Sequence, residues 1–421
     1  MKLDQVEREM LSGRRGRAVQ WAMEFMVEVG EYFGAERMVG VTSALVLADV
    51  EIMGLPGADL IAGFAHEGVR FCCPSMTAPG VEQPELGGLL GLNVERAELQ
   101  RSVNRDLCRM GAEALDTCIP YQWAYRPRVG EHLAWADTGA VCYANSVLGA
   151  QANFESGPAS LAAGLTGRVP EYGFHLQRHR RGTVLVQVEV ELHGLADWGA
   201  LGAYVGRQVT DYWQVPIIEG LGARCRPDEL KHLAASLGAV GSIAMFGLVG
   251  VTPEAMTLGA AFADGQPERV IKVGPAEIDG LYRLYMPVTE DVEAVVLSAP
   301  QLSLEEIGTI AEMLEGQRVH DGTQLILTTC VGVLRAAEGL GYVSTIERAG
   351  GAIITGICLY HVELDRIVER FGWRQMVTNS VKLANNVAPF DIVPVLRSTE
   401  ECVAAAIEGR LSSHGRNSEE R

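Results

Sequence analysis

Residue types that can carry chemistry are concentrated between residues 116 and 153. Within this stretch a Thr-Cys-Ile-Pro turn contains Cys118, and turn-like spacings follow at Asp137, Asn145, Ser146 and Asn153. A cysteine in such a turn lies on a loop, where its thiolate can reach a metal ion or a substrate. Because the acid and the amides can hold a polar ligand, the stretch is more typical of a functional site than of a plain core.

The composition restricts the class of protein. The chain has 421 residues, 48% of them hydrophobic, which predicts a globular protein of two or three α/β units. Its formal charge of −18 argues against nucleic acid and anionic membranes as partners, although a few local arginines still allow an anionic substrate. We expect a cytoplasmic protein, because there is no signal-peptide pattern or spanning apolar run and the nine cysteines form no regular framework.

Periodicity predicts the elements that position these residues. Helical spacing marks residues 3–33, 92–112 and 228–238, while strands are predicted at 68–73, 184–192 and 241–246. From residue 290, strand and helix patterns alternate over 294–298, 303–313, 324–328, 331–338 and 352–355. Such alternation indicates βαβ units on a parallel sheet. The polar tail, residues 411–421, is expected to be disordered.

Several common motifs are absent from the sequence. There is no phosphate-binding P-loop, no G-x-G-x-x-G after a strand, and no H-E-x-x-H, G-x-S-x-G or C-x-x-C motif. The adjacent Cys72 and Cys73 lack zinc-site spacing and are interpreted as inert thiols. These absences argue against the common nucleotide-binding, zinc-protease and serine-hydrolase classes.

The order of several short motifs resembles that of the aconitase X family, a branch of the aconitase superfamily. The motifs extend over nearly the whole chain; they are Glu7-x-x-Met10-Leu11, Thr117-Cys118-Ile119-Pro120-Tyr121, Trp135-Ala136-Asp137, Asn145-Ser146-Val147-Leu148-Gly149-Ala150, Pro170-x-Tyr172-Gly173-Phe174-His175, Gly250-Val251-Thr252-Pro253-Glu254-Ala255 and Thr378-Asn379-Ser380-x-Lys382. No single motif is specific, but their common order is.

This resemblance implies a fold and a reaction. The fold is α/β, with interlocked three-layer units over residues 1–410 and without the small swivelling domain that carries a catalytic serine in the superfamily. In split members a separate chain supplies that domain, so a partner subunit is expected. The implied reaction is loss of water from a small hydroxy acid, such as cis-3-hydroxy-L-proline or 5-phosphomevalonate. Family members hold an iron or iron–sulfur centre, and iron can take the leaving hydroxide while a base removes a proton and cations hold the carboxylate.

The resemblance also implies roles for individual residues. The expected metal ligands are Cys118 and Cys358. The expected catalytic residues are Cys118, Asp137, His175 and Glu254, and the expected substrate-binding residues are Asn145, Ser146, Asn153, Arg180, Arg181, Ser380 and Lys382. Structural alternatives exist: the basic run at 175–181 can be a solvated surface, Asp, Asn and Ser commonly form turns, and Thr-Pro-Glu at 252–254 also fits a helix N-terminus.

The sequence departs from the family pattern at one ligand. The family's Gly-Cys-Pro-His turn reads Ser-Ala-Pro-Gln at 298–301, so Ala299 replaces a cysteine. A cluster normally needs three or four protein ligands, whereas two of the family's three cysteines remain, with Cys330 or Cys142 as possible substitutes. The family's Thr-Asn-Arg also reads Ala-Asn-Phe at 152–154, which removes a cation. Three alternatives follow: a metal-dependent dehydratase, a cluster-free isomerase or altered lyase of a specialised pathway, and a non-catalytic subunit that supports a partner.

Overall fold

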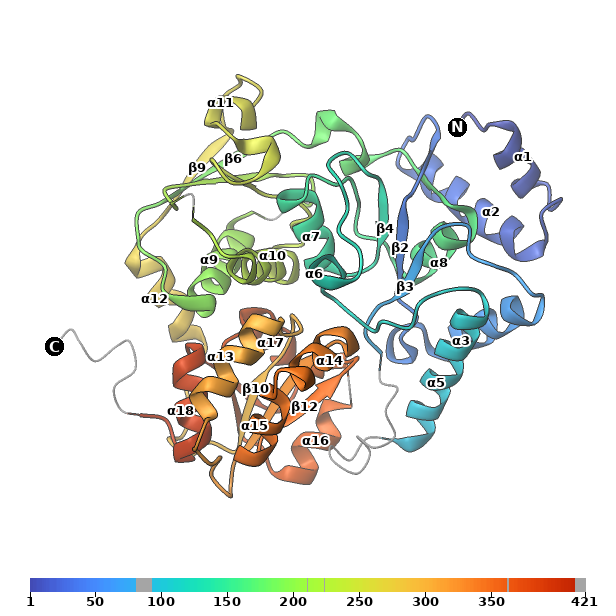
Figure 1. The fold of residues 1–421 in the computed structure, drawn as a ribbon. Coiled ribbons are helices and arrows are strands. Elements are labelled where there is room, and N and C mark those ends of the chain that lie inside the picture. Colours follow the sequence, from blue (N-terminus) through green and yellow to red (C-terminus); the bar gives the residue numbers. More distant parts are fainter. Residues whose placement is uncertain (81–92, 210, 223, 362, 413–421) are drawn as a thin grey trace.

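The computed structural model describes residues 1–80, 93–209, 211–222, 224–361 and 363–412, and it contains three parallel sheets with helices packed against them (Figure 1). We call the parts of the chain that carry these sheets the first, second and third units. Within the described ranges, no helix is both long enough and apolar enough to cross a membrane. Most of the tail that we expected to be disordered, residues 413–421, lies outside the described residues.

The first unit is built on the parallel sheet β3-β2-β4, with β1 and β5 paired antiparallel beside it. Its elements are α1 (Gln5–Leu11), α2 (Arg17–Tyr32), β1 (Met38–Gly40), β2 (Ser43–Val46), α3 (Val50–His66), β3 (Ser75–Thr77), α5 (Val94–Arg109), α6 (Pro120–Trp123), β4 (Leu133–Trp135), α7 (Thr138–Val147), α8 (Gly157–Thr166) and β5 (Arg168–Pro170). Alternate residues of β2 enter different cores: Ala44 and Val46 pack with α2 and α8, while Leu45 packs with α7. Helices therefore cover both faces of this sheet.

The second unit has the parallel strand order β8-β7-β6-β9. Its elements are β6 (Val184–Val188), α9 (Gly194–Gln208), β7 (Pro216–Glu219), α10 (Pro227–Gly241), β8 (Gly247–Leu248), α11 (Leu258–Ala261), β9 (Arg269–Val273) and α12 (Pro275–Leu284). Two predicted strands are wrong. Residues 241–246 form no strand because α10 runs to Gly241 and Ser242 turns the chain with a left-handed φ of 53°. Similarly, β3 begins at Ser75, after the predicted segment 68–73.

The third unit confirms the alternating pattern read from residue 290 onwards. Its elements are β10 (Ala294–Leu297), α13 (Leu304–Leu314), β11 (Gln324–Thr329), α14 (Val331–Gly339), α15 (Tyr342–Ala349), β12 (Ala352–Thr355), α16 (Leu364–Phe371), β13 (Gln375–Thr378), α17 (Val381–Val387), β14 (Val393–Leu396) and α18 (Thr399–Glu408). The sheet order is β12-β11-β10-β13-β14, all parallel. Val295 and Leu297 pack in the core shared with α13 and α15, whereas Val296 packs with α16 and α17, which makes three layers.

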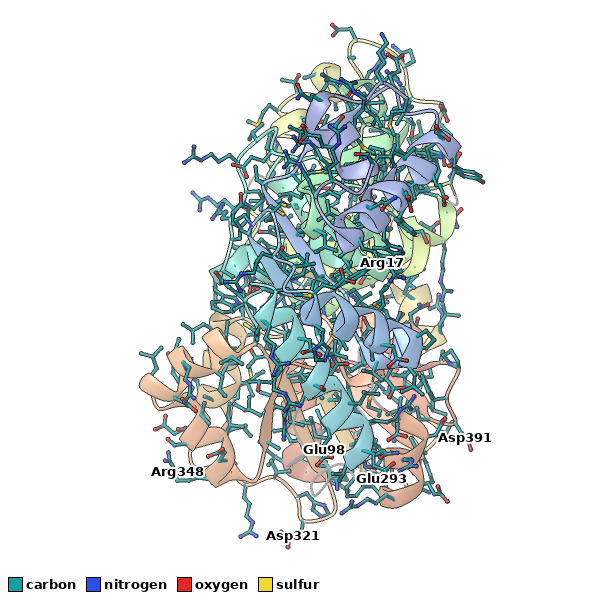
Figure 2. The ribbon with its side chains drawn as sticks, turned by 90° about the vertical axis from the view of Figure 1, so that its right-hand side faces the viewer. Arg17, Glu98, Glu293, Asp321, Arg348 and Asp391 are labelled. Carbon is teal, nitrogen blue, oxygen red and sulfur yellow. The ribbon has the colours of Figure 1, made fainter. Side chains whose placement is uncertain are left out.

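The first unit reaches the third through α5. The backbone N–H of Asn93, which caps α5, donates to Glu363 at 2.9 Å, and Arg96 lies 3.6 Å from the same carboxylate. Figure 2 shows Glu98 of α5 at the level of Glu293, which precedes the first strand of the third unit. The hydrogen bond of Asn93 joins the segment after β3 to the segment after β12, and the candidate site lies where these two segments meet.

Candidate functional site

The site begins where segments at the carboxyl ends of the first and third sheets touch. The backbone N–H of Gly80, after β3, donates to the carbonyl of Gly356, after β12, at 2.9 Å. The turns that carry Cys118 and Cys358 lie at the same junction, and their sulfur atoms are 3.9 Å apart although the residues are 240 positions apart in sequence. Ligand sites in open α/β sheets typically lie at the carboxyl ends of the strands, so this junction is the candidate active site.

The two cysteines are joined by a hydrogen bond. Cys118 and Cys358 are both buried, and the thiol of Cys358 donates to Cys118 Sγ. This hydrogen bond outweighs burial and lowers the pKa of Cys118, while the same bond and burial raise the pKa of Cys358 well above its ordinary value. The backbone N–H of Gln301 also donates to Cys118 Sγ, at 3.3 Å. Of the two thiols, Cys118 is therefore the one that loses its proton more readily.

A buried cation faces the thiol pair. Lys382 lies in the first turn of α17, with its Nζ 3.5 Å from Asp137 Oδ2 and 5.9 Å from the ring centre of Tyr360. Burial alone would lower the pKa of Lys382, but Asp137, Tyr360 and the two thiols raise it well above its ordinary value. The ammonium group thus stays protonated in the folded protein. It is a suitable partner for a carboxylate or phosphate oxygen.

Helix caps fix the side chains around this cation. Asp137 caps α7 by accepting from the backbone N–H of Ala140, and Ser380 caps α17 by accepting from the N–H of Leu383. The hydroxyl of Ser380 donates in turn to the carbonyl of Ala299, at 2.6 Å. Asp, Ser and similar residues satisfy the free N–H groups of a first helical turn. Asp137, Ser380 and Lys382, predicted as site residues, are therefore brought together with both cysteines.

The donor atoms do not fit a cluster held by three cysteines. Ala299 occupies the expected ligand position with a buried methyl group, and the described residues contain no group of three or more His, Cys, Asp or Glu side chains that could hold a metal ion. Neither Cys330 nor Cys142 therefore completes a ligand set with the pair in the described structure. Two thiolates fall short of the three or four protein ligands that such clusters normally use.

A second group of predicted residues lies towards the other end of α7. Asp137 and Asn145 are eight residues apart, about 12 Å along a helix axis. Arg180 is buried and donates from Nε to Glu254 at 2.7 Å and from its other nitrogens to Asn145 and to the carbonyl of Phe174. This geometry lets Arg180 join the first unit to the second. The binding of a substrate anion by Arg180, and a catalytic role for Glu254, remain predictions.

The predicted polar residues near Arg180 make backbone contacts. Asn145 bonds Ala152 and the carbonyl of Ala244, Ser146 accepts from the N–H of Phe246, and Asn153 accepts from the N–H of Phe174. Arg181, in contrast, is exposed. These contacts explain why the amides are buried without requiring a ligand.

His175 pairs with a second histidine. The Nδ1 atoms of His175 and His132 are 3.0 Å apart, so one ring donates to the other. Burial lowers the pKa of His175 to about 3, which keeps its ring neutral at physiological pH. Its Nε2 atom is buried and has no partner among the described residues. Because its hydrogen-bond partner His132 looks isolated in the sequence, the pairing of the two rings was not predicted.

Several buried ionisable residues were missed. Burial raises the pKa of Asp49, which follows β2, to about 7 and that of Glu155 to about 8. On α10, Lys231 contacts Asp228 and Glu306, and His232 lies 3.0 Å from Glu306. Single acids and lysines carry no sequence signal that separates a buried group from a solvated one. The spacing of Asp228 and Lys231 on one helix face was the one available hint.

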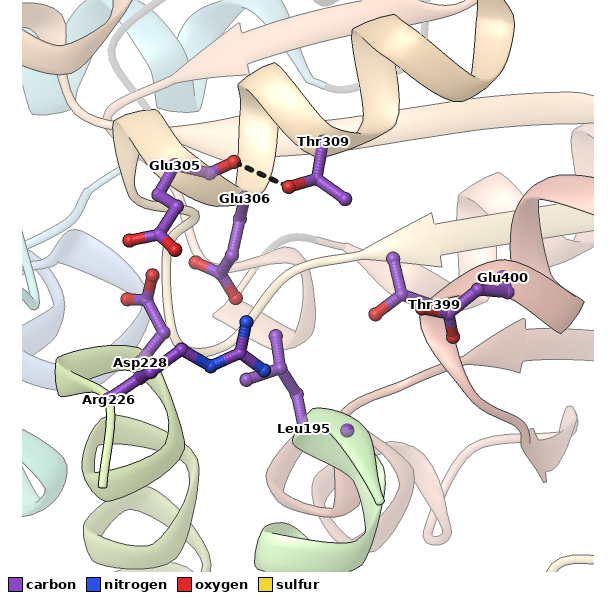
Figure 3. Close-up of a pocket in the computed structure, with 9 residues that line it drawn as sticks. Leu195, Arg226, Asp228, Glu305, Glu306, Thr309, Thr399 and Glu400 are labelled. Atoms are coloured by element: carbon purple, nitrogen blue, oxygen red, sulfur yellow. Dashed lines mark hydrogen bonds between the residues drawn. The ribbon is translucent and has the colours of Figure 1, made fainter. Parts of the chain in front are cut away.

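A small pocket lies beside this network. It has a volume of about 80 Å³ and is lined by Leu195, Arg226 and Asp228 of the second unit and by Glu305, Glu306 and Thr309 of the third (Figure 3). Thr309 donates to the carbonyl of Glu305, as the dashed line shows. Arg226 pairs with Glu229, while Asp228 and Glu306 both pair with Lys231, so we interpret this pocket as part of the contact between the two units.

Comparison with known proteins gives matches over nearly the whole chain. Family models for the first, second and third domains of aconitase X match residues 1–178, 182–283 and 292–408. A phosphomevalonate dehydratase large subunit from Thermococcus kodakarensis is 32% identical, with 96% of this chain and 100% of that protein covered. A cis-3-hydroxy-L-proline dehydratase from Pseudomonas aeruginosa is also 32% identical, with 97% of this chain and 70% of that protein covered.

A solved structure supports the same relation. The crystal structure of Thermococcus kodakaraensis aconitase X in its holo-form superposes with a TM-score of 0.86 at 32% identity, and the match covers 96% of this chain and 100% of that one. The similarity therefore extends to the arrangement of all three units.

Proposed function

The chain belongs to the aconitase X family, and from this membership we propose that it is the large subunit of a hydro-lyase that removes water from a small hydroxy acid. The observation that carries the proposal is the convergence of Cys118, Asp137 and Lys382 at the junction of the first and third units. Relatives named as dehydratases over nearly the full chain support it.

The charge of the site favours an anionic substrate. Lys382 is the buried cation beside the thiol pair, and its ammonium group can bind a carboxylate. When a proton leaves the carbon next to that carboxylate, negative charge builds up on the carboxylate oxygens, and the fixed ammonium stabilises it. Asp137 holds Lys382 in position. A hydroxy acid of the phosphomevalonate or hydroxyproline type satisfies these requirements.

A separate small subunit is part of the proposal. Several relatives bear the name "large subunit", and the match with this chain covers 86% to 100% of the length of each. We propose that the partner docks over the junction of the first and third units and supplies a serine that takes the proton from carbon. Residues of this chain would then bind and orient the substrate while the partner completes the site.

The lost ligand favours a second candidate, a cluster-free enzyme. Ala299 leaves two cysteines at the position where the family resemblance implies three, and no third donor joins them in the described structure. We therefore derive no step through an iron–sulfur cluster. Elimination or isomerisation that relies on Lys382, Asp137 and the thiol pair is consistent with the residues present.

The test combines composition with turnover. The chain is purified without oxygen together with its small subunit, and iron and acid-labile sulfide per chain are measured alongside dehydration of 5-phosphomevalonate and cis-3-hydroxy-L-proline. Turnover with background iron supports the cluster-free enzyme, while turnover with stoichiometric iron that is lost in Cys118→Ser supports the metal-dependent one. A stable complex that converts neither compound would count against the dehydratase and favour the non-catalytic subunit.

A further inference from the structure

We infer that Cys118 and Cys358 form a redox-active pair that closes into a disulfide between the first and third units. None of the nine cysteines forms a disulfide in the structure, and within the described residues Cys118 and Cys358 are the two brought together across a unit boundary, at 3.9 Å with one sulfur hydrogen-bonded to the other. The inference concerns a modification of the site and does not depend on which reaction the enzyme catalyses.

The geometry needs a small movement. A disulfide bond is about 2.05 Å long, so the sulfur atoms must approach by about 1.9 Å. Neither cysteine lies in a regular element: Cys118 precedes α6, and Cys358 lies in the segment after β12. Connecting segments adjust more easily than strands or helices. The pair can therefore close without displacing either sheet.

The surroundings favour reaction of Cys118 first. Its sulfur accepts hydrogen bonds from the thiol of Cys358 and from the backbone N–H of Gln301, and both donors stabilise negative charge there. Because Ala299 removes the third donor, the two sulfurs are not committed to a three-cysteine ligand set. In a site with three ligand cysteines, bound metal would compete with disulfide formation. Here the remaining pair is free to react as a dithiol.

The step balances with a small-molecule disulfide as oxidant. The Cys118 thiolate attacks one sulfur of R–S–S–R, which forms a mixed disulfide and releases one RS⁻. The sulfur of Cys358 then attacks Cys118, its proton passes to the second leaving sulfur, and a second RSH departs. The two cysteines lose two electrons, and the oxidant gains them. A thiol reductant reverses the reaction.

The experiment treats the reduced full-length chain with oxidised glutathione and counts free thiols after denaturation. We expect the count to fall from nine to seven, and tryptic peptides 110–128 and 349–366 to appear as one linked species. Cys118→Ser and Cys358→Ser must both lack the linked species. Cys72→Ser, which removes an exposed thiol elsewhere, must retain it.

Three outcomes would overturn the inference: both cysteines remain open to alkylation, glutathione stays on Cys118 unresolved, or stoichiometric iron in the same sample keeps both thiols unreactive. Thiol counting and peptide mapping need no turnover. Failure of the disulfide is therefore distinguishable from failure of the proposed dehydratase. Where activity is present, oxidation is expected to abolish it and dithiothreitol to restore it.

Discussion

Replacement of Lys231 by methionine tests how the second and third units are held together. Lys231 is 1% exposed, lies 3.1 Å from Asp228 and contacts Glu306 of α13. Its ammonium also donates to the carbonyl of Gln301 at 3.2 Å. Gln301 in turn bonds Cys118, so this lysine connects α10 with the candidate active site.

The magnitude follows from the pKa of Glu306. Burial alone would raise it, but Lys231 and His232 lower it from 4.5 to about 2. At about 1.4 kcal/mol for each pKa unit, this difference corresponds to about 3 kcal/mol of stability. Removal of one partner from a buried ion pair costs a similar amount, about 3–5 kcal/mol, because the other charge is left unpaired. We therefore expect Lys231→Met to lower the free energy of unfolding by about 3 kcal/mol.

The assay is urea unfolding at pH 7, with Lys272→Met as the matched control. Lys272 belongs to the same unit and pairs with Glu189 at 3.5 Å, but both side chains are more than half exposed. An exposed pair contributes between 0 and about 1 kcal/mol. Near-equal losses in the two variants would refute the assignment of Lys231 to a buried network.

The dependence on pH gives a second check. Since the folded-state pKa of Glu306 is depressed, its contribution is fully present above pH 4.5 and is lost as the pH falls towards 2. Without Lys231, the effect of burial on the pKa of Glu306 dominates, and the contribution of Glu306 to stability disappears. The difference between parent and variant should therefore be largest near neutral pH and shrink below pH 4.5. A difference that grows on acidification would contradict the argument.

Four further changes test other parts of the structure. Ala299→Cys adds a thiol at the expected ligand position, and iron and sulfide content after anaerobic reconstitution should rise above that of the parent chain. Lys382→Met removes the buried cation, and the ratio kcat/KM of the complex with the small subunit should fall about 10- to 100-fold, as for a lost charged hydrogen bond. Arg180→Met leaves Glu254 without its partner and should cost about 3 kcal/mol in urea unfolding. Glu155 has a pKa of about 8 in the folded state, so stability should fall as the pH rises from 4.5 to 8, and Glu155→Gln should abolish that fall.

The fold was predictable where the hydrophobic period of each segment and the alternation of strand and helix segments indicate the same structure. The alternation after residue 290 predicted β10, α13, β11, α14 and β12 to within two residues at each boundary. The apolar run at 241–246 was misread because a short buried segment has the same composition whether or not it joins a sheet. Pairing depends on neighbours in space, and the strand that actually pairs there is β8.

The site was predictable only in part, because several of its contacts likewise depend on neighbours in space. The family resemblance selected Cys118 and Cys358, and the structure brings their sulfurs together. The contacts of Gln301 with Cys118 and of Lys231 with Gln301 join residues far apart in the chain, so no local pattern reports them. Arg180 illustrates the converse: a basic run suggests an anion site, but the partner Glu254 is visible only after folding.

The turn at Ala299 explains how a ligand position can be lost while the site is kept. Ser380 donates to the carbonyl of Ala299, and the backbone N–H of Gln301 donates to Cys118. Both bonds use main-chain atoms of the turn, so neither depends on the side chain at position 299. A change from cysteine to alanine there removes a sulfur donor but leaves the thiol pair, Lys382 and Asp137 in place. We therefore expect metal binding and substrate binding to be separable in this scaffold, and we propose that the retained charges select an anionic hydroxy acid.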